Sequence, residues 1–152
     1  MSIPAHKSSE QGFTLIELMV VITIIGLLSA VVVLTVPDPR GRVLEDAERM
    51  AARASAIRDM AVVEARPTAI WIDTGGYGFE RRRDGQWTAL NDKPFANTRW
   101  KSGNSALTGG TRQRVVFDNL GLADHALTVP VIGNGQRVGV RIGDDGKVKV
   151  VG

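Results

Sequence analysis

Hydrophobic and polar positions divide the chain into three stretches with different periods. An apolar run from Phe13 to Val36 carries a single ionisable residue, Glu17. An amphipathic stretch follows over residues 43–66, and from Pro67 onward apolar and polar residues alternate in short segments. These changes of period predict a long apolar helix, then an amphipathic helix, and then a region of β-strands.

The apolar run is long enough to cross a lipid bilayer. It has 24 residues, which as a helix reach about 36 Å, whereas the hydrocarbon layer is about 30 Å thick. The run has no polar face, which disfavours a helix buried in a soluble core. It is also longer than the apolar region of a secretory signal peptide, which has about 7–15 residues. We therefore expect residues 13–36 to form one transmembrane helix.

The second stretch has apolar residues that step by three and four along one helical face. These residues are Val43, Ala47, Met50, Ala54, Ile57 and Ala61, and the face is widened by Leu44, Ala51 and Ala65. Pro37 and Pro39 separate this helix from the apolar one, because proline lacks an amide donor and restricts the residue before it. Pro67 ends the helix near Arg66. We expect the helix to pack its apolar face on the strands that follow; the alternative is a coiled-coil partner.

The last stretch predicts short strands joined by turns. The predicted strands cover residues 68–74, 77–83, 86–90, 113–118, 126–132, 137–142 and 147–151. The Asp-Gly sequences at residues 84–85 and 145–146 indicate tight turns between strands. Residues 91–110 are expected to form a loop, because proline and several glycines interrupt them. The fold class is therefore α+β, with a long amino-terminal helix packed on an antiparallel sheet or sandwich.

Composition narrows the kinds of site that the chain can hold. The 152 residues suffice for one small domain and an anchor, and 43% of them are hydrophobic. There is no cysteine, so disulfides and thiolate metal sites are excluded. The net charge of +3 is mildly basic, and solubility alone explains it.

Glu17 is costly at its position, and its surroundings form a recognisable motif. A charged side chain at the centre of a bilayer costs roughly 2.5–3.5 kcal/mol, so we expect it to be functional. The sequence GFTLIE at residues 12–17, behind a polar leader with Lys7, resembles the class III signal of type IV pilins and type II secretion pseudopilins. The resemblance implies cleavage between Gly12 and Phe13 by a prepilin peptidase, and N-methylation of Phe13.

The resemblance also implies an organisation along the chain. It divides the chain into a removable leader (residues 1–12), a transmembrane helix (13–36), an amphipathic helix (37–66) and a β-rich periplasmic head (67–152). The protein would cross the bacterial inner membrane once before it assembles into a fibre. The positive-inside rule favours the opposite orientation, because the leader offers only Lys7 whereas Arg40 and Arg42 follow the span.

The order of elements resembles more narrowly the H-type minor pseudopilins, which with FimT-like minor pilins form the GspH/FimT-like family. The shared features are a helix ending at residues 61–65, strands at 69–73 and 77–79, a hairpin with Trp87, a strand at 115–117 followed by Gly121, and a closing Gly-Lys-Val hairpin. The segment at residues 118–120 departs from the family, where relatives often have proline and glycine.

The function that this resemblance implies is structural. The chain would be a minor pseudopilin near the tip of the pseudopilus that drives protein export; the alternative is a type IV pilus minor pilin in pilus assembly or DNA uptake. Its partners would be other minor and major pseudopilins, the prepilin peptidase and the inner-membrane assembly platform. Glu17 would leave the lipid to meet the cationic amino terminus of a neighbouring subunit.

We expect no enzymatic activity, cofactor or metal site. His6 lies in the removable leader, so a serine nucleophile would have only His125, and no serine has the surroundings of a nucleophile elbow. Three consecutive arginines, Arg81, Arg82 and Arg83, fit either a solvated strand end or a contact with nucleic acid. Trp87 and Trp100 could then stack on bases, although they also fit the core of the head. Nucleic acid is the less favoured partner.

Overall fold

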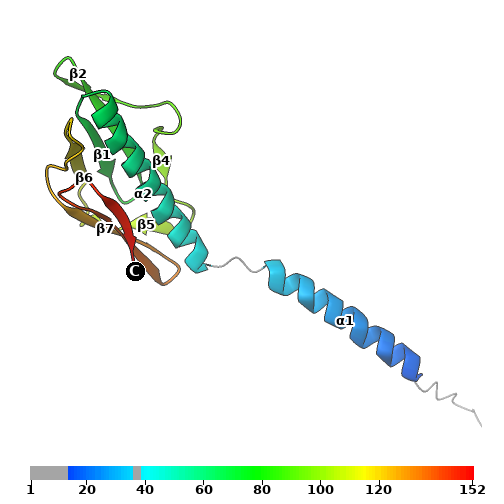
Figure 1. Cartoon of the computed structure of the whole chain (residues 1–152). Helices are drawn as coiled ribbons and strands as arrows, with labels where there is room; N and C mark the ends of the chain where they lie inside the picture. The colour runs from blue at the N-terminus through cyan, green and yellow to red at the C-terminus, as the bar shows by residue number, and fades with distance from the viewer. Residues whose placement is uncertain (1–13, 36–38) are drawn as a thin grey trace, which may run out of the picture. The chain divides into compact units, whose positions relative to one another are not determined.

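The computed structural model describes the backbone of residues 14–35 and 39–152, and the side chains of residues 14–29 and 41–152. The chain divides into two compact units, with the division between residues 37 and 38. Helix α1 (Leu15–Thr35) lies in the first unit. Helix α2 (Pro39–Val63) and the described strands form the second unit, which we call the head (Figure 1).

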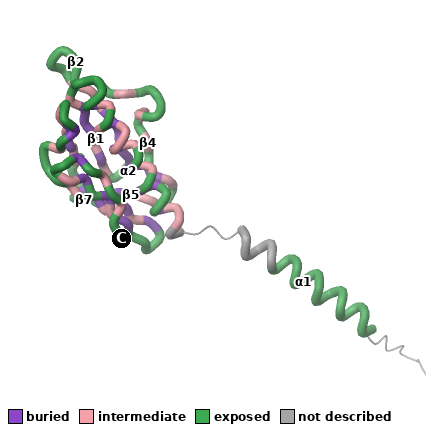
Figure 2. Tube along the Cα trace, in the orientation of Figure 1, coloured by how far each residue is buried: buried purple, intermediate pink, exposed green. Residues whose placement is uncertain are grey.

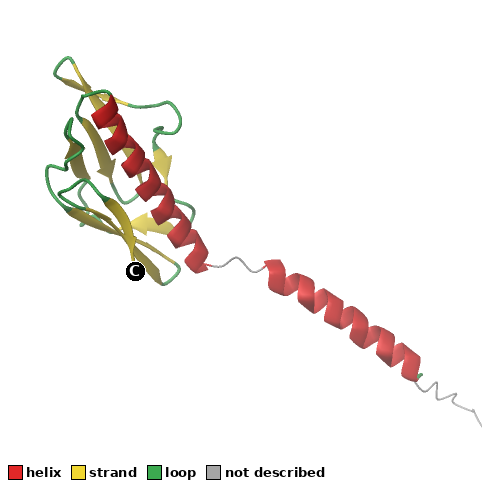
Figure 3. Cartoon of the chain, viewed as in Figure 1, coloured by secondary structure: helices red, strands yellow, loops and turns green. Residues whose placement is uncertain are grey.

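The strands of the head form two antiparallel sheets. Sheet A has the order β3-β2-β1-β6, with β4 paired to the start of β2. Its strands are β1 (Thr68–Ile72), β2 (Gly76–Arg83), β3 (Gln86–Ala89), β4 (Thr98–Arg99) and β6 (Gln113–Phe117). Sheet B has the order β5-β7-β8-β9. Its strands are β5 (Asn104–Ala106), β7 (Leu127–Gly133), β8 (Gln136–Ile142) and β9 (Val148–Val151). Figure 3 shows α2 running along these strands.

Helix α2 packs its apolar face on both sheets. It contacts β1 of sheet A and β7, β8 and β9 of sheet B. Its fully buried residues are Val43, Ala47, Met50, Ala54, Ile57 and Ala61. These are the residues of the predicted apolar face, so the prediction that this face packs on the strands is confirmed.

The apolar face of α2 is narrower than predicted. Ala51 is buried, but Leu44 is 38% exposed and Ala65 is also exposed. Leu44 lies about 100° around the helix from the buried Val43, which turns it away from the sheets. Ala65 lies beyond the end of the helix.

The carboxyl end of α2 comes three residues before the predicted end at Arg66. The chain turns at Ala65, which has a φ of 50°. The Arg66 amide then donates to the Ala61 carbonyl over 3.0 Å, the long-range bond of a Schellman motif. Because Pro67 disfavours a helical residue before it, the helix has to end upstream of Arg66.

Both sheets contribute apolar side chains to one core under α2. The core residues of the strands include Ile70, Ile72, Tyr77, Phe79, Val115 and Phe117 from sheet A and Val129, Val131, Val140 and Ile142 from sheet B. From Val129 to Gly133 in β7 and from Val138 to Ile142 in β8, every second residue is buried. Figure 2 shows the buried residues gathered in the head. The structure therefore confirms the predicted α+β head, with an amphipathic helix on antiparallel strands.

The seven predicted strands are present, and each end lies within two residues of its predicted position. The expectation of a loop over residues 91–110 is wrong in part, because β4 and β5 form within it. These two short strands have no alternating apolar pattern, and they exist because they pair with β2 and β7. Gly76 permits this pairing, since a side chain there would collide with the carbonyl group of Thr98.

A buried carboxylate joins α2 to the segment between β4 and β5. Asp46 is only 3% exposed. It accepts hydrogen bonds from the Lys101 amide at 2.8 Å and from Asn104 Nδ2 at 2.9 Å. A buried charge is tolerated when it is hydrogen-bonded in this way. Asp46 therefore positions this segment against the first half of α2.

Replacing Asp46 with alanine is expected to destabilise the head by about 3 kcal/mol, because two hydrogen bonds to a charged group are lost. Thermal unfolding of the purified chain should show a midpoint lower by roughly 10 °C. Glu48→Ala is the matched control, since Glu48 is exposed on the same helix and its loss should cost less than about 0.5 kcal/mol. Equal midpoints for the two variants would contradict this role of Asp46.

Candidate functional site

Glu17 lies in the first turn of α1, where it has a local structural role. The Glu17 amide donates to Thr14 Oγ1 over 3.3 Å, and the Leu18 amide donates to the Thr14 carbonyl over 3.2 Å. Thr14 is therefore the N-cap of α1, and Glu17 occupies the third helical position of a T-x-x-E capping pattern. A negative charge there also suits the positive end of the helix dipole. This pattern, readable in the sequence, could have located the start of the helix.

The described side chains of α1 are exposed, and most of them are apolar. Every residue from Thr14 to Ser29 is exposed, and Leu15, near the start of the helix, is 80% exposed. The polar residues bond within the helix: Thr23 Oγ1 donates to the Met19 carbonyl at 2.7 Å, and Ser29 Oγ donates to the Ile25 carbonyl at 2.8 Å. This part of α1 therefore presents apolar groups on all sides.

The predicted processing position, at Gly12 and Phe13, lies outside the described residues. The predicted span over residues 13–36 also begins and ends outside them. Over residues 14–35 and 39–152, no helix meets the combined requirements of length and hydropathy for crossing a membrane. Among Gly12, Phe13 and Glu17, the residues of the predicted processing and assembly motif, Glu17 is the one whose position the structure describes.

The three consecutive arginines do not form one cluster. Arg81 points to the end of α2, where its Nη1 lies 3.0 Å from Glu64 Oε2. Arg82 lies on the other face of β2, opposite Trp87. Arg83 lies at the turn, 4.0 Å from Asp84 Oδ2. Because side chains alternate along a strand, consecutive arginines cannot present one basic surface, and a nucleic-acid contact by all three stays a prediction.

The two tryptophans of the predicted stacking pair lie in different environments. Trp100 is 7% exposed and packs in the core beside Tyr77, with ring centroids 5.1 Å apart. Trp87 is half-buried on the outer face of sheet A, where the Arg114 guanidinium lies 4.1 Å from its ring centroid. Arg114 is in turn held by Glu80 Oε2 at 2.8 Å. Trp87 therefore stacks on an arginine of its own sheet.

The described residues show no grouping typical of a metal centre. No three potential metal ligands among them come together. The Asp144-Asp145-Gly146 sequence forms the predicted turn between β8 and β9. Asp145 is bound by Lys147, which donates from Nζ at 2.9 Å and from its amide at 3.0 Å. These hydrogen bonds hold the pKa of the Asp145 carboxyl below its usual value.

Tyr77 is the one tyrosine of the chain and lies in the core, where burial raises its pKa above the usual value. The folded state favours the neutral side chain. Burial of Tyr77 therefore contributes fully to the free energy of unfolding below the ordinary tyrosine pKa of about 10, and this contribution is lost as the pH rises above it. We expect tyrosinate absorbance to appear together with unfolding as the pH rises beyond about 10. Tyr77→Phe should lose less stability over the same range. Tyrosinate formation near pH 10 without a change in the unfolding midpoint would contradict this expectation.

The amino-terminal region matches a known family model. Residues 7–33 match the prokaryotic N-terminal methylation motif. This match covers Gly12, Phe13 and Glu17, the three residues singled out by the sequence pattern. A search of curated proteins finds no match to the chain.

The chain matches solved structures of two kinds of minor subunit. The minor pseudopilin EpsH from the Type 2 Secretion System of Vibrio cholerae has a TM-score of 0.59 and 18% identity; the match covers 72% of this chain and 95% of that chain. The type IV minor pilin FimU of Pseudomonas aeruginosa has a TM-score of 0.60 and 17% identity, with 74% of this chain and 90% of that chain covered. At these identities the likeness shows the fold. The chain therefore combines a prokaryotic N-terminal methylation motif with a fold like that of a minor pseudopilin and a type IV minor pilin.

Proposed function

We propose that the chain is a minor pseudopilin of a type II secretion system, a structural subunit near the tip of the periplasmic pseudopilus that drives protein export. The observation that carries this proposal is the combination of a prokaryotic N-terminal methylation motif with a fold that matches 95% of the solved EpsH chain. A subunit of this kind acts by packing against its neighbours. Its partners would therefore be other pilin-type subunits that pack against it in the fibre.

In this proposal the prepilin peptidase cleaves between Gly12 and Phe13, and Phe13 becomes the methylated amino terminus. The apolar run from residue 13 to 36 then holds the subunit in the bacterial inner membrane, with the head in the periplasm. The exposure of every described side chain from Thr14 to Ser29 supports this step, because such a surface needs lipid or other helices around it. The inner-membrane assembly platform moves the helix from lipid into the fibre.

Glu17 makes the transfer into the fibre selective. In lipid its carboxylate is costly. In the fibre it meets the cationic amino terminus of a neighbouring major or minor pseudopilin. Residues of α1 that flank Glu17 are apolar, so this ion pair is kept from water, and losing one partner is expected to be costly.

A second candidate function is that of a minor pilin of a type IV pilus, with a role in pilus assembly or DNA uptake. The match to FimU, at a TM-score of 0.60, favours it as directly as the EpsH match favours secretion. DNA uptake has less support, because Arg81 is paired with Glu64, Arg82 lies on the other face of β2, and Trp87 is covered by Arg114.

Deleting the gene in its own bacterium separates the two candidates. The secretion function predicts that exported proteins disappear from the culture medium and accumulate in the periplasm, while surface pili remain. Restoring the intact gene should restore export. Loss of pili with normal export would support the pilus function instead. Normal export and normal piliation would contradict both.

A further inference from the structure

Two leucines between β6 and β7 face solvent, although the segment that carries them is well ordered by hydrogen bonds. Leu120 is 69% exposed and Leu122 is 45% exposed. Asp118 Oδ1 accepts hydrogen bonds from both leucine amides at 2.9 Å, and the Asp118 amide donates to the Leu122 carbonyl at 2.9 Å. The segment therefore satisfies its own backbone and still presents two large apolar side chains outward.

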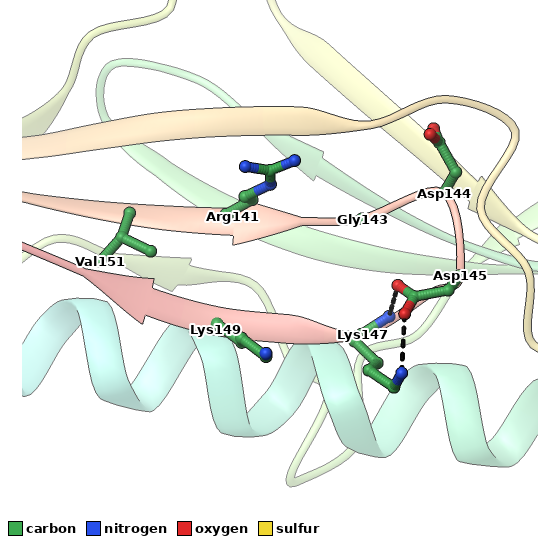
Figure 4. A pocket seen from close by; sticks show the side chains of 7 residues that line it. All are labelled: Arg141, Gly143, Asp144, Asp145, Lys147, Lys149 and Val151. Atoms are coloured by element: carbon green, nitrogen blue, oxygen red, sulfur yellow. Dashed lines mark hydrogen bonds and ion pairs between the residues drawn. The ribbon is translucent and has the colours of Figure 1, made fainter.

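The end of α2 and the turn between β8 and β9 hold this segment in place. Arg58 Nε donates to the Gly121 carbonyl at 3.2 Å, and the Ala123 amide donates to the Asp144 carbonyl at 3.1 Å. Gly146 permits the close approach of the turn, since a side chain there would collide with the Gly121 carbonyl oxygen. Figure 4 shows this turn from close by, where it lines a hollow of about 570 Å³.

The last turn of α2 adds two exposed valines beside the leucines. Val62 is 45% exposed, and Val63, the next residue, is 84% exposed. Gly121 lies so close to α2 that a side chain on it would meet a Val62 methyl group at 3.0 Å. This end of α2 is about 36 Å from its first residue, at about 1.5 Å per residue. We call these four neighbouring side chains the apolar patch: Val62, Val63, Leu120 and Leu122.

Charges next to the apolar patch are mostly paired within the head. Glu64 Oε2 lies 3.0 Å from Arg81 Nη1, and Asp59 Oδ1 lies 3.4 Å from Arg58 Nη1. Arg66 is exposed beyond the end of the helix. Nucleic acids and anionic lipid surfaces are bound by clusters of cations. The surroundings of the patch therefore favour an apolar protein surface as its partner.

The apolar patch is too small to hold two free proteins together. It has four residues, whereas a stable protein interface uses about 20–30 residues on each side. A contiguous apolar patch nevertheless often marks a contact with another protein. A partner that other contacts already keep beside the chain has a high effective concentration, so a small contact then suffices. Neighbouring subunits of a fibre meet this condition, and a dimer held by the patch alone does not.

We propose that the apolar patch binds an apolar surface of a different pilin-type subunit, which lies beside the carboxyl end of α2 in the fibre. The contact would remove the four side chains from water. This inference rests on the proposed function for its setting, and it adds the surface through which the chain meets a neighbour. A different subunit is expected, because a minor subunit near the tip of a fibre is not surrounded by copies of itself.

The test uses the full chain in its own bacterium. Asn119 is exposed next to Leu120, and it is replaced by the photoreactive residue p-benzoylphenylalanine before the cells are irradiated. Mass spectrometry of the crosslinked product should identify a second protein that carries an N-terminal methylation motif. The matched control places the same photoreactive residue at Gln136, which is exposed at the start of β8, and it should give at least roughly tenfold less of this product.

Substitutions within the apolar patch make the test specific. Val63→Ser and Leu120→Ser together should reduce the crosslinked product at least roughly tenfold, because the apolar area that leaves water on contact is smaller. Leu120→Met alone should preserve the product, since methionine keeps an adaptable apolar contact. Leu107→Ser is the matched control, because Leu107 is 47% exposed just after β5, and it should leave the product unchanged.

The folding of each variant is checked separately. All the substituted side chains are exposed, so the thermal midpoint of the purified full chain should be nearly the same for each variant. Leu120→Ser alone repeats the comparison with a smaller change to the head. It should also reduce the crosslinked product, although by less than the double variant.

Four results would overturn the proposal: a product no stronger than that from Gln136, a product between two copies of this chain, a product with an exported protein, or a product that the serine substitutions leave unchanged. The crosslink is measured independently of export. The expected crosslink together with normal export in the deletion strain would contradict the secretion function and keep the contact. Lost export without the crosslink would contradict the contact alone, so the two failures are distinguishable.

Discussion

Replacing Glu17 with alanine is expected to leave the chain in the membrane and to prevent its incorporation into a fibre. Insertion should be at least as favourable, because the variant removes a charge that costs roughly 2.5–3.5 kcal/mol in lipid. In the fibre, the amino terminus of a neighbour would be left buried without its partner. Breaking a buried ion pair by removing one partner costs about 3–5 kcal/mol, which corresponds to more than a hundredfold in an equilibrium constant.

The measurement compares membrane and sheared-fibre fractions of cells that express the variant or the unchanged chain. Asp92→Ala is the matched control, because it removes an exposed carboxylate from the head and should assemble normally. The capping pattern at Thr14 predicts a second, smaller effect, since losing a favourable first-turn charge costs less than about 1 kcal/mol of helix stability. Normal amounts of Glu17→Ala in the fibre fraction would contradict the ion-pair role.

Removing α2 is expected to unfold the head. A shortened chain that begins near Arg40 should fold alone, because α2 and the two sheets close one core without α1. A chain that begins at Pro67 would lose Val43, Met50 and Ile57, which are fully buried. Burying each such side chain is worth about 1.5–3 kcal/mol, and the three together approach the whole stability of a small domain, about 5–15 kcal/mol.

Circular dichroism and calorimetry of the two shortened chains would test this expectation. The longer chain should give a cooperative thermal transition, and the shorter one should aggregate or show no transition. A shorter chain that melts close to the longer one would mean that α2 adds little to the head. The buried face of α2 would then have to be explained by another partner.

Patterns that repeat over many residues predicted most of the fold. The spacing of Val43, Met50 and Ile57 identified the buried side of α2, and alternation in β7 and β8 located the strands of sheet B. In both cases one side of the element is buried, so apolar residues recur at the period of the helix or the strand. The motif around Glu17 was equally readable, because it depends on fixed offsets.

Features that depend on a distant partner could not be predicted. Strands β4 and β5 exist because β2 and β7 pair with them. Trp87 lies on the outer face of sheet A, where Arg114, three strands away, covers its ring. In the sequence, Asp46 resembles an ordinary surface acid of a helix. Its role depends on the Lys101 amide and the Asn104 side chain, which are distant in the sequence. Such residues have no periodic signature, and only the assembled head shows their roles.

The most direct test of the pilin-type assignment is the intact mass of the protein extracted from membranes of its own bacterium. The account predicts one species that begins at Phe13 and carries one methyl group on its amino terminus. Gly12→Val should leave the leader attached, because a side chain at that position hinders the peptidase. A native chain that retains Met1, or that is cut within the apolar run, would contradict the account.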